Sequence, residues 1–259
     1  MTTIPVITMS HGDVSDHFTT YPDDSVKSIG GSAVVQVLLP SYKRIIEKGA
    51  PESKVVVIGN AVPQYDFCVD LSKEKTIYNV VTVGRLTKSI KRPHLLIEAF
   101  TRIAEKYPNW IVELWGAKDR EAYYKELELM VSKNGLQNRV FLKGATNDVP
   151  SALKASDIFV FPSAFEGFGM ALAEGMSVGL PAIGYNSCPA VNELIENGKT
   201  GVLCEDGVEP LAAAMEQLMG NRALRVQMGK AAKEAMAQYA PARIWDQWEE
   251  LISKTVANK

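Results

Sequence analysis

The stretch Phe161-Pro-Ser-Ala-Phe-Glu-Gly-Phe-Gly-Met170 joins an apolar, β-rich run to a helix-forming segment. Gly167 and Gly169 allow the backbone a sharp turn just before that helix. Where a parallel strand passes into a helix in this way, the amides of the first helical turn are exposed at the ligand-binding edge of the sheet. The stretch therefore predicts an α/β domain with an anion site, such as a phosphate site, at this turn.

The same alternation of strand and helix runs through the chain from residue 77 onward. Strands are expected at 80–83, 110–115, 139–142, 158–161, 181–185 and 201–204, and helices at 93–106, 120–134, 150–155, 170–178, 190–196 and 208–219. Right-handed crossovers between such strands produce a mostly parallel sheet with helices on both faces. We therefore expect a doubly wound, Rossmann-like α/β domain.

The first 66 residues show a shorter version of this pattern, with strands expected at 6–9, 33–38 and 55–58 and a helix at 40–48. Three strands hardly close a core alone, so the segment is predicted to be part of an α/β domain. The predicted organisation is a partial amino-terminal domain (1–66), a linker (67–75), the Rossmann-like domain (76–240) and a terminal helix (241–259). The apolar stripe of that helix, which includes Ile244, Trp248 and Leu251, packs either on its own domain or across to the first one.

Composition limits the classes of function. Lys and Arg (28) nearly balance Asp and Glu (30), for a formal charge of −2, so a nucleic-acid partner is not expected. Cys68, Cys188 and Cys204 form no CxxC pair, which favours a reducing compartment over a disulfide or zinc framework. No apolar run approaches the roughly 18 residues of a membrane span. We expect a cytoplasmic chain, with peripheral contact to the inner face of the membrane left open.

Charged side chains follow two of the predicted strands. Glu166 precedes a predicted helix, and Glu174 lies inside it, at most about 12 Å further along the helix axis. Carboxylates accept hydrogen bonds from hydroxyl groups, so the pair favours a polyhydroxylated ligand on either side of a diphosphate. Arg85 and Lys91 follow an earlier strand and place two cations at the same edge of the sheet. The alternative is that Glu166 caps the helix and that the other three are solvated surface residues.

Six motifs occur in a fixed order between residues 77 and 257. They are Gly84-Arg-Leu86, Lys91-Arg-Pro-His-Leu-Leu-Ile-Glu-Ala-Phe100, Val140-Phe-Leu-Lys-Gly144, Pro162-Ser163 followed by Glu166-Gly-Phe-Gly169 and Glu174, Gly179-Leu-Pro181 and Gly198-Lys-Thr-Gly201. In this order they resemble the carboxyl-terminal domain of family 4 glycosyltransferases. Earlier segments, Pro5-Val-Ile-Thr-Met-Ser-His11-Gly12, Ser32-Ala-Val-Val35 and Lys54-Val-Val-Val-Ile-Gly59-Asn60, resemble the end of that family's amino-terminal domain.

The resemblance implies the GT-B fold and retaining transfer of a hexosyl group. The donor would be a nucleotide-diphosphate sugar, UDP or GDP, the acceptor a glycan or lipid-linked molecule, as in polysaccharide biosynthesis, and no metal would be required. The family carries roughly another hundred residues ahead of the position of His11, so the chain is expected to lack most of the first domain. A partner chain that completes this domain is left open.

Carried over to this sequence, the resemblance implies four catalytic residues. Arg85 and Lys91 match the pair that binds the donor diphosphate and stabilises its leaving charge. Glu166 matches a residue that contacts donor-sugar hydroxyls, and His11 one that reaches toward the donor sugar. The donor-binding positions that it implies are Gly84, Phe168, Gly169, Met170 and Glu174, the last at the nucleotide ribose.

Two departures from the family pattern leave the donor open. Gly59-Asn60-Ala61 stands where the family usually has Pro-Asn-Gly, and Asn186-Ser187-Cys188 stands where a glycine pair is common. A second class of function also stays open, namely a non-catalytic nucleotide-sugar-binding fragment or a subunit of a split glycosyltransferase. A nicotinamide oxidoreductase is disfavoured, because no Gly-x-Gly-x-x-Gly opens a helix after a strand.

Overall fold

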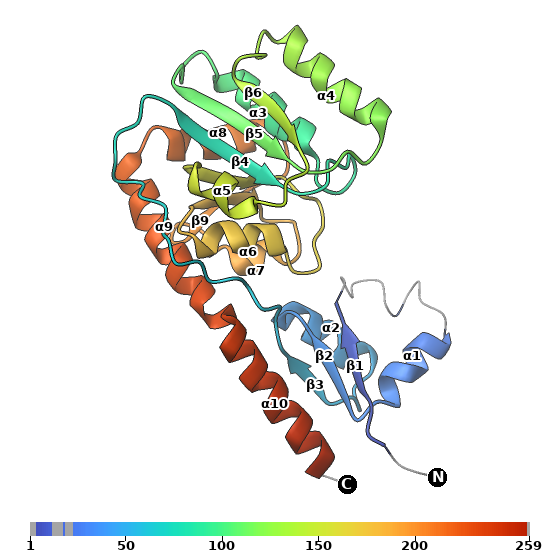
Figure 1. Ribbon diagram of the computed structural model, residues 1–259. Coiled ribbons are helices and arrows are strands. Elements are labelled where there is room, and N and C mark those ends of the chain that lie inside the picture. Colours follow the sequence, from blue (N-terminus) through green and yellow to red (C-terminus); the bar gives the residue numbers. More distant parts are fainter. Residues whose placement is uncertain (1–3, 12–17, 19–22, 258–259) are drawn as a thin grey trace. The chain divides into compact units, whose positions relative to one another are not determined.

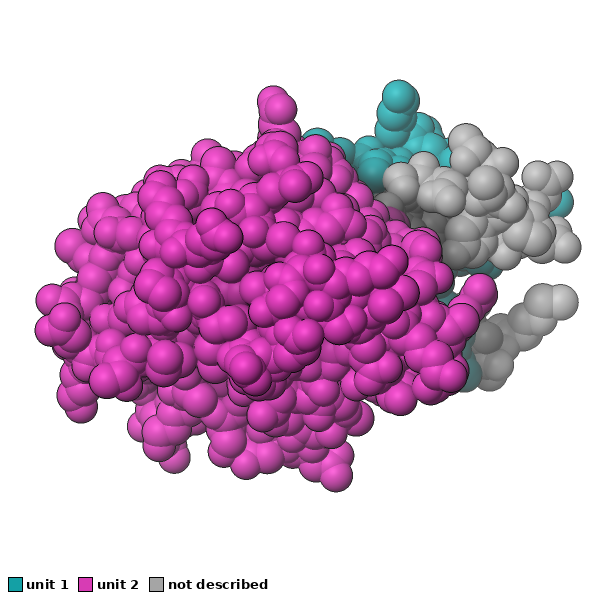
Figure 2. All heavy atoms as spheres, turned by 90° about the horizontal axis from the view of Figure 1, so that it is seen from above, with its two compact units in different colours: residues 1–62, 166–168, 238–259 teal, residues 63–165, 169–237 magenta. Residues whose placement is uncertain are grey.

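The computed structural model describes residues 4–11, 18 and 23–257 (Figure 1). The chain divides into two compact units, coloured separately in Figure 2. Unit 1 comprises residues 1–62, 166–168 and 238–259, and unit 2 comprises residues 63–165 and 169–237. The division into domains at residues 66, 75 and 240 stays a prediction.

Unit 2 is built on a parallel sheet of six strands in the order β6-β5-β4-β7-β8-β9. The strands are β4 (Tyr78–Val83), β5 (Trp110–Trp115), β6 (Val140–Gly144), β7 (Ile158–Phe161), β8 (Ala182–Tyr185) and β9 (Gly201–Cys204). Counted along the chain, this is the strand order of doubly wound Rossmann folds. Every residue of β7 and β8 is buried, as happens in a parallel sheet that is covered on both faces. The expectation of a doubly wound parallel sheet is confirmed.

Helices cover both faces of this sheet (Figure 1). Helix α3 (Pro93–Ile103) packs along α8 (Val208–Met219) and α4 (Glu121–Lys133), whereas α6 (Met170–Ser177) packs along α9 (Arg222–Met236). The shorter α5 (Val149–Lys154) and α7 (Val191–Leu194) complete the set, and a 3-10 turn, Ala237–Tyr239, follows α9. Helix α3 shows why these segments form helices, because its buried residues Leu96, Ile97, Phe100 and Ile103 recur at helical spacing.

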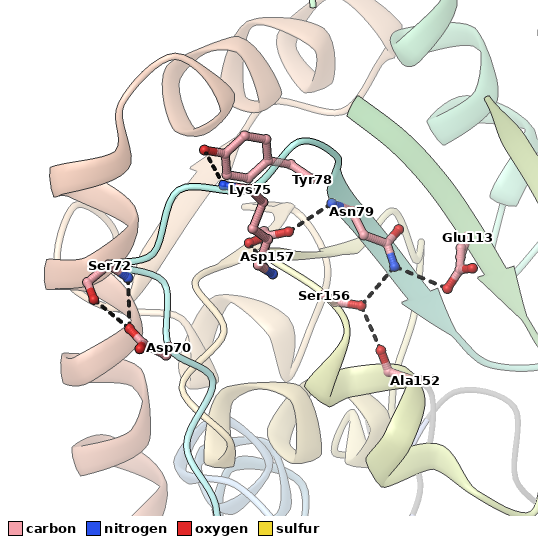
Figure 3. A network of polar contacts seen from close by, with 9 residues as sticks. All are labelled: Asp70, Ser72, Lys75, Tyr78, Asn79, Glu113, Ala152, Ser156 and Asp157. Atoms are coloured by element: carbon pink, nitrogen blue, oxygen red, sulfur yellow. Dashed lines mark hydrogen bonds and ion pairs between the residues drawn. The ribbon is translucent and has the colours of Figure 1, made fainter. Parts of the chain in front are cut away.

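A polar network holds the amino ends of β4 and β7 together (Figure 3). The carboxylate of Asp157, just before β7, accepts a hydrogen bond from the Asn79 amide at 2.8 Å and pairs with the Lys75 ammonium at 2.8 Å. The side-chain amide of Asn79 donates to Glu113 at 3.1 Å and to Ser156 at 3.2 Å. Because Asn79 is the second residue of β4 and Ser156 precedes β7, the network lies at the amino edge of the sheet.

Unit 1 contains a second parallel sheet, with strands in the order β1 (Ile7–Ser10), β2 (Val34–Val37) and β3 (Val55–Val57). Helix α1 (Asp23–Gly30) was not expected from the sequence, since it offers few apolar residues to set a helical period. Helices α2 (Pro40–Gly49) and α10 (Pro241–Ala257) complete the unit. Helix α10 begins at Pro241, because proline is tolerated in a first helical turn.

The apolar stripe of α10 packs against the strands of unit 1. Ile244 and Leu251 form a buried cluster with Val34 and Ile58, and Trp248 packs against it. None of the described helices combines the length and the apolar composition that crossing a membrane requires.

Candidate functional site

The order of the strands sets the position of the site. The chain leaves β4 toward β5 on one side, and it leaves β7 toward β8 on the other side. The two strands are hydrogen-bonded neighbours, with Val81 opposite Phe159. A crevice outside the carboxyl ends of the strands opens at such a reversal, and doubly wound folds bind their ligands there. Two predicted site segments, the one that begins at Gly84 and the one around Gly169, follow these two strands.

The side chain of Lys91, in the loop just before α3, reaches the point between β4 and β7 where the strand order reverses. Gly84 has a φ of +154°, and a Cβ built on it would lie 3.5 Å from Lys91 Cε, so the lysine stem runs over the glycine. The ammonium group lies 4.7 Å from the ring centre of Phe161, the last residue of β7. The Lys91 amide donates to Thr87 Oγ1 at 2.9 Å. Lys91 therefore brings a positive charge to the carboxyl ends of both β4 and β7.

Arg85 lies at the same edge with a fixed backbone and an exposed side chain. The amide of Leu86 donates to the Ala117 carbonyl at 3.0 Å. Gly116 approaches Gly84 so closely that an added Cβ would collide with the Gly84 carbonyl oxygen. Over the part of the chain that the structure describes, the Arg85 guanidinium forms no hydrogen bond or ion pair. The backbone is thus held, whereas the guanidinium is available to a ligand.

Helix α6 presents its amino terminus at the end of the loop that follows β7. Gly169 is its N-cap, with a φ of +85°, and provides no side chain to bond the first amides. Gly169 is buried, and Met170, the first helical residue, is half-buried. The first amides of a helix have no partner within the helix, and its dipole adds partial positive charge there. The start of α6 is therefore suited to an anionic ligand.

Glu174 lies in the second turn of α6 and is half-buried. Desolvation raises the pKa of its carboxyl group above the ordinary value. The pKa of the Tyr65 phenol is also raised, first by burial and second by the charge of Glu174. A partly desolvated carboxylate is a strong acceptor for hydroxyl groups, since water competes less for it.

Glu166 and Phe168 belong to unit 1, where packing fixes their segment. Glu166 is 9% exposed, and its backbone carbonyl accepts a hydrogen bond from the Tyr42 hydroxyl at 2.8 Å. The Phe168 ring meets the Tyr239 ring edge-on, with centres 5.2 Å apart. Gly59 faces the same rings, since an added Cβ would lie 2.8 Å from Tyr239 and 3.2 Å from Phe168.

His11, directly after β1, is exposed and also belongs to unit 1. It lines a cavity of about 720 Å³ together with Asn60, Trp245 and Trp248. The structure thus brings Gly84, Arg85, Lys91, Gly169 and Met170 to one edge of unit 2, with Glu174 further along α6, and it describes His11, Glu166 and Phe168 within unit 1. Within the described ranges, no group of three His, Cys, Asp or Glu side chains is arranged to hold a metal ion.

Arg92 is the residue at this edge that the sequence analysis missed. It follows Lys91, and its side chain donates to the backbone after β7. Basic residues at the start of a helix are common, and no spacing distinguished this one from its neighbours.

Comparison with known proteins assigns the family. Residues 63–235 match the model of the group 1 glycosyl transferases. Because the match covers more than half of the chain, the chain belongs to this family. The expected Rossmann-like GT-B fold is confirmed by the structural neighbours, among them Anabaena Alr3699/HepE, solved in complex with UDP and glucose. That structure has a TM-score of 0.79 and 21% identity, and the alignment covers 96% of this chain and 72% of HepE.

Two curated relatives are each 28% identical to this chain over the aligned residues. An uncharacterised glycosyltransferase of Haemophilus influenzae is 28% identical over 174 residues, which are 67% of this chain and 48% of the relative. The capsular polysaccharide biosynthesis glycosyltransferase CapM of Staphylococcus aureus is 28% identical over 227 residues, which are 82% of this chain and 58% of CapM. The chain spans about half the length of these relatives.

Proposed function

We propose that the chain provides the donor site of a retaining glycosyltransferase that moves a hexosyl group from a nucleotide-diphosphate sugar to a glycan or lipid-linked acceptor. The observation that carries the proposal is the position of Arg85 and Lys91 at the reversal point, where α6 also begins. Two cations and a helix amino terminus at one edge match the charge of a diphosphate.

The chemistry of the proposed reaction explains why positive charge is needed there. The bond between the anomeric carbon and the diphosphate breaks, and its electron pair leaves with the phosphate oxygen. A new bond forms between the anomeric carbon and the acceptor oxygen, on the face that the phosphate leaves, and the acceptor proton passes to that phosphate. Arg85, Lys91 and the first amides of α6 would stabilise the charge that develops on the leaving group. We propose that these groups suffice without a metal ion.

The remaining site residues have recognition roles in this proposal. Glu174 accepts hydrogen bonds from the ribose hydroxyls, and its partial desolvation strengthens them. Glu166 accepts from hydroxyls of the donor sugar, next to the amides of Phe168, Gly169 and Met170. We assign His11 a contact to the donor sugar as well, as the family resemblance implies.

The ligands of relatives guide the choice of substrates. HepE was solved with UDP and glucose, so UDP-glucose is the first donor to test, ahead of GDP-sugars. The name of CapM refers to capsular polysaccharide biosynthesis, which supports a glycan or lipid-linked acceptor. We further propose a cytoplasmic location with peripheral contact to the inner face of the membrane, where such an acceptor would be reached. The alternative proposal is a split enzyme, in which a partner chain completes the amino-terminal domain.

Calorimetric titration with a panel of UDP- and GDP-sugars tests the proposal. At least one sugar nucleotide is expected to bind. Glu166→Ala is expected to lower the affinity for that donor by about 10- to 150-fold, as for a lost hydrogen bond to a charged group. Glu209→Ala, at an exposed ion pair with Arg102, is the matched control and should bind normally. If no sugar nucleotide binds, the proposal is wrong. Binding without turnover in a transfer assay would support the non-catalytic, nucleotide-sugar-binding alternative.

A further inference from the structure

The backbone of Arg92 is in a conformation that residues with side chains avoid. Arg92 is the N-cap of α3, and its φ of +47° and ψ of +46° place it in the left-handed region. This region is strained for a residue with a Cβ, whereas glycine adopts it freely. An arginine at such a position therefore needs compensating contacts from its side chain.

The Arg92 side chain makes these contacts across three neighbouring strands. Its Nε donates to the Pro162 carbonyl, just after β7, at 3.0 Å. One terminal nitrogen pairs with Asp206, after β9, at 2.9 Å. The guanidinium carbon lies 4.9 Å from the ring centre of Tyr185 on β8. Only 16% of the side chain is exposed. Arg92 therefore connects the ends of β7, β8 and β9 along the carboxyl edge of the sheet.

A second bond joins the same two loops on the other side of Lys91. The amide of Ala164 donates to the Ile90 carbonyl at 2.8 Å. The residues before and after Lys91 are therefore both tied to the loop that follows β7. The Lys91 ammonium, in turn, lies over Phe161 at the end of that strand.

We infer that Arg92 is a positioning residue, which holds the loop of residues 84–92 against the loop after β7 so that Lys91 reaches the donor diphosphate. The inference rests on the proposed function, because it concerns the same phosphate site. Arg92 uses Nε and one terminal nitrogen to bind Pro162 and Asp206, and its other terminal nitrogen is buried without a hydrogen-bond partner among the described residues. Because these two bonds hold the guanidinium on the protein, the inference is that Arg92 acts through Lys91. An arginine suits this task because its planar group reaches both partners at once, which a lysine ammonium does not do in the same geometry.

A double-mutant cycle read out by UDP and uridine titration tests the inference. Arg92→Met is expected to weaken UDP binding about tenfold and to leave uridine binding unchanged, since uridine lacks the diphosphate. In the Lys91→Met background the same substitution is expected to have no effect on UDP. Arg92→Lys is expected to behave like Arg92→Met. Arg102→Met, on the exposed side of α3, is the matched control and should bind UDP normally.

Three results would overturn the inference. The first is an equal loss from Arg92→Met with and without Lys91, which would mean that Arg92 acts through its own charge. The second is full UDP binding by Arg92→Lys, and the third is unchanged UDP binding by Arg92→Met. If Arg92→Met fails to fold, Arg92→Gly replaces it in the cycle, because glycine removes the backbone strain. If the unaltered chain binds a GDP-sugar and no UDP-sugar, GDP and guanosine replace UDP and uridine in the cycle. Absence of binding by every UDP- and GDP-sugar would contradict the proposed function and this inference together, whereas the three results above leave the proposed function intact.

Discussion

The amino and carboxyl ends of the unit 2 sheet use polar residues in opposite ways. At the amino end, Asp157 is buried and is bonded to Asn79 and Lys75. Arg225, 2% exposed, packs against the stacked rings of Tyr78 and Trp110, with its guanidinium carbon 5.2 and 5.0 Å from their centres. Each of these charged groups has partners within the protein, so this end uses its polar groups for stability.

At the carboxyl end of the same sheet, hydrogen-bond donors are available to a ligand. Arg85 is exposed and has no hydrogen-bonding or ionic partner among the described residues. The backbone around it is fixed through Leu86 and the close approach of Gly116 to Gly84. In a parallel sheet every helix begins after the carboxyl end of a strand, which concentrates helix amino termini at one edge. The fold therefore separates the residues that stabilise unit 2 from those available to a ligand, at opposite ends of the strands.

The largest expected effect is the loss of stability in Asp157→Ala. The substitution removes a buried carboxylate and leaves the Asn79 amide and the Lys75 ammonium without their partner. Loss of one partner of a buried pair typically costs about 3 to 5 kcal/mol in the free energy of unfolding, and we expect the lower end of that range because the Lys75 side chain is 28% exposed. Urea unfolding measures this loss, and UDP affinity should be unchanged under conditions where the variant is folded. Asp70→Ala is the matched control, because the pair of Asp70 with Lys73 is largely exposed and should contribute little to stability. A loss below about 1 kcal/mol in Asp157→Ala would contradict the structural role.

Arg85→Gln is expected to have the opposite profile and a smaller effect. Losing one charge-assisted contact should lower the UDP affinity by about 10- to 150-fold, which corresponds to about 1.5 to 3 kcal/mol of binding free energy. Since Arg85 is exposed, the free energy of unfolding should change by less than about 0.5 kcal/mol. Calorimetry and urea unfolding on the same preparation separate the two quantities. Loss of stability together with unchanged UDP binding would argue against a binding role for this end.

The smallest effect concerns Glu174, whose pKa is raised by desolvation. The unfolded carboxyl group ionises at a lower pH than the folded one, so ionisation favours the unfolded state, and stability falls as the pH rises through the raised pKa. Glu174→Gln should therefore have a higher Tm than the unaltered chain at pH 7, and the difference should vanish below the ordinary pKa of 4.5. The same variant should bind UDP more weakly.

Glu250→Gln provides a control of opposite sign for this pH dependence. A hydrogen bond from Lys254 lowers the pKa of Glu250, which is fully exposed. Ionised Glu250 therefore favours the folded state above the lowered pKa, and its replacement should lower the Tm slightly at pH 7. A lower Tm for Glu174→Gln at pH 7 would contradict the desolvation of that residue.

Much of the fold was predictable because the strands of unit 2 are short apolar runs between clear turns. The predicted strands at 110–115, 158–161 and 201–204 coincide with β5, β7 and β9, and the helix at 208–219 coincides with α8. Helix α1 was missed, because it is short and polar overall and contains only two large apolar residues, Val26 and Ile29. The segment that begins at Gly84 and the loop that ends at Gly169 lie at the same edge of one sheet, as the sequence indicated. The adjacency of their strands, β4 and β7, was not predicted.

The contacts that complete the site depend on tertiary structure and were not predictable. The bonds of Arg92 to Pro162 and Asp206 join residues far apart in the sequence. The left-handed backbone of Arg92 has no sequence signal either, because only a glycine would indicate it. The assignment of residues 166–168 to unit 1 is a second case, since it depends on packing against Tyr42 and Tyr239. The roles of His11 and Glu166 stay predictions.

The most direct test of the central claim is a UDP titration of the double variant Arg85→Gln/Lys91→Met beside the unaltered chain. The double variant removes the two cations that we assign to the diphosphate, while the buried network at the amino end is untouched. We predict that UDP affinity falls at least about a hundredfold, with the unfolding midpoint in urea nearly unchanged. Unchanged UDP affinity in a folded double variant would contradict the claim that this end of the sheet binds the donor diphosphate.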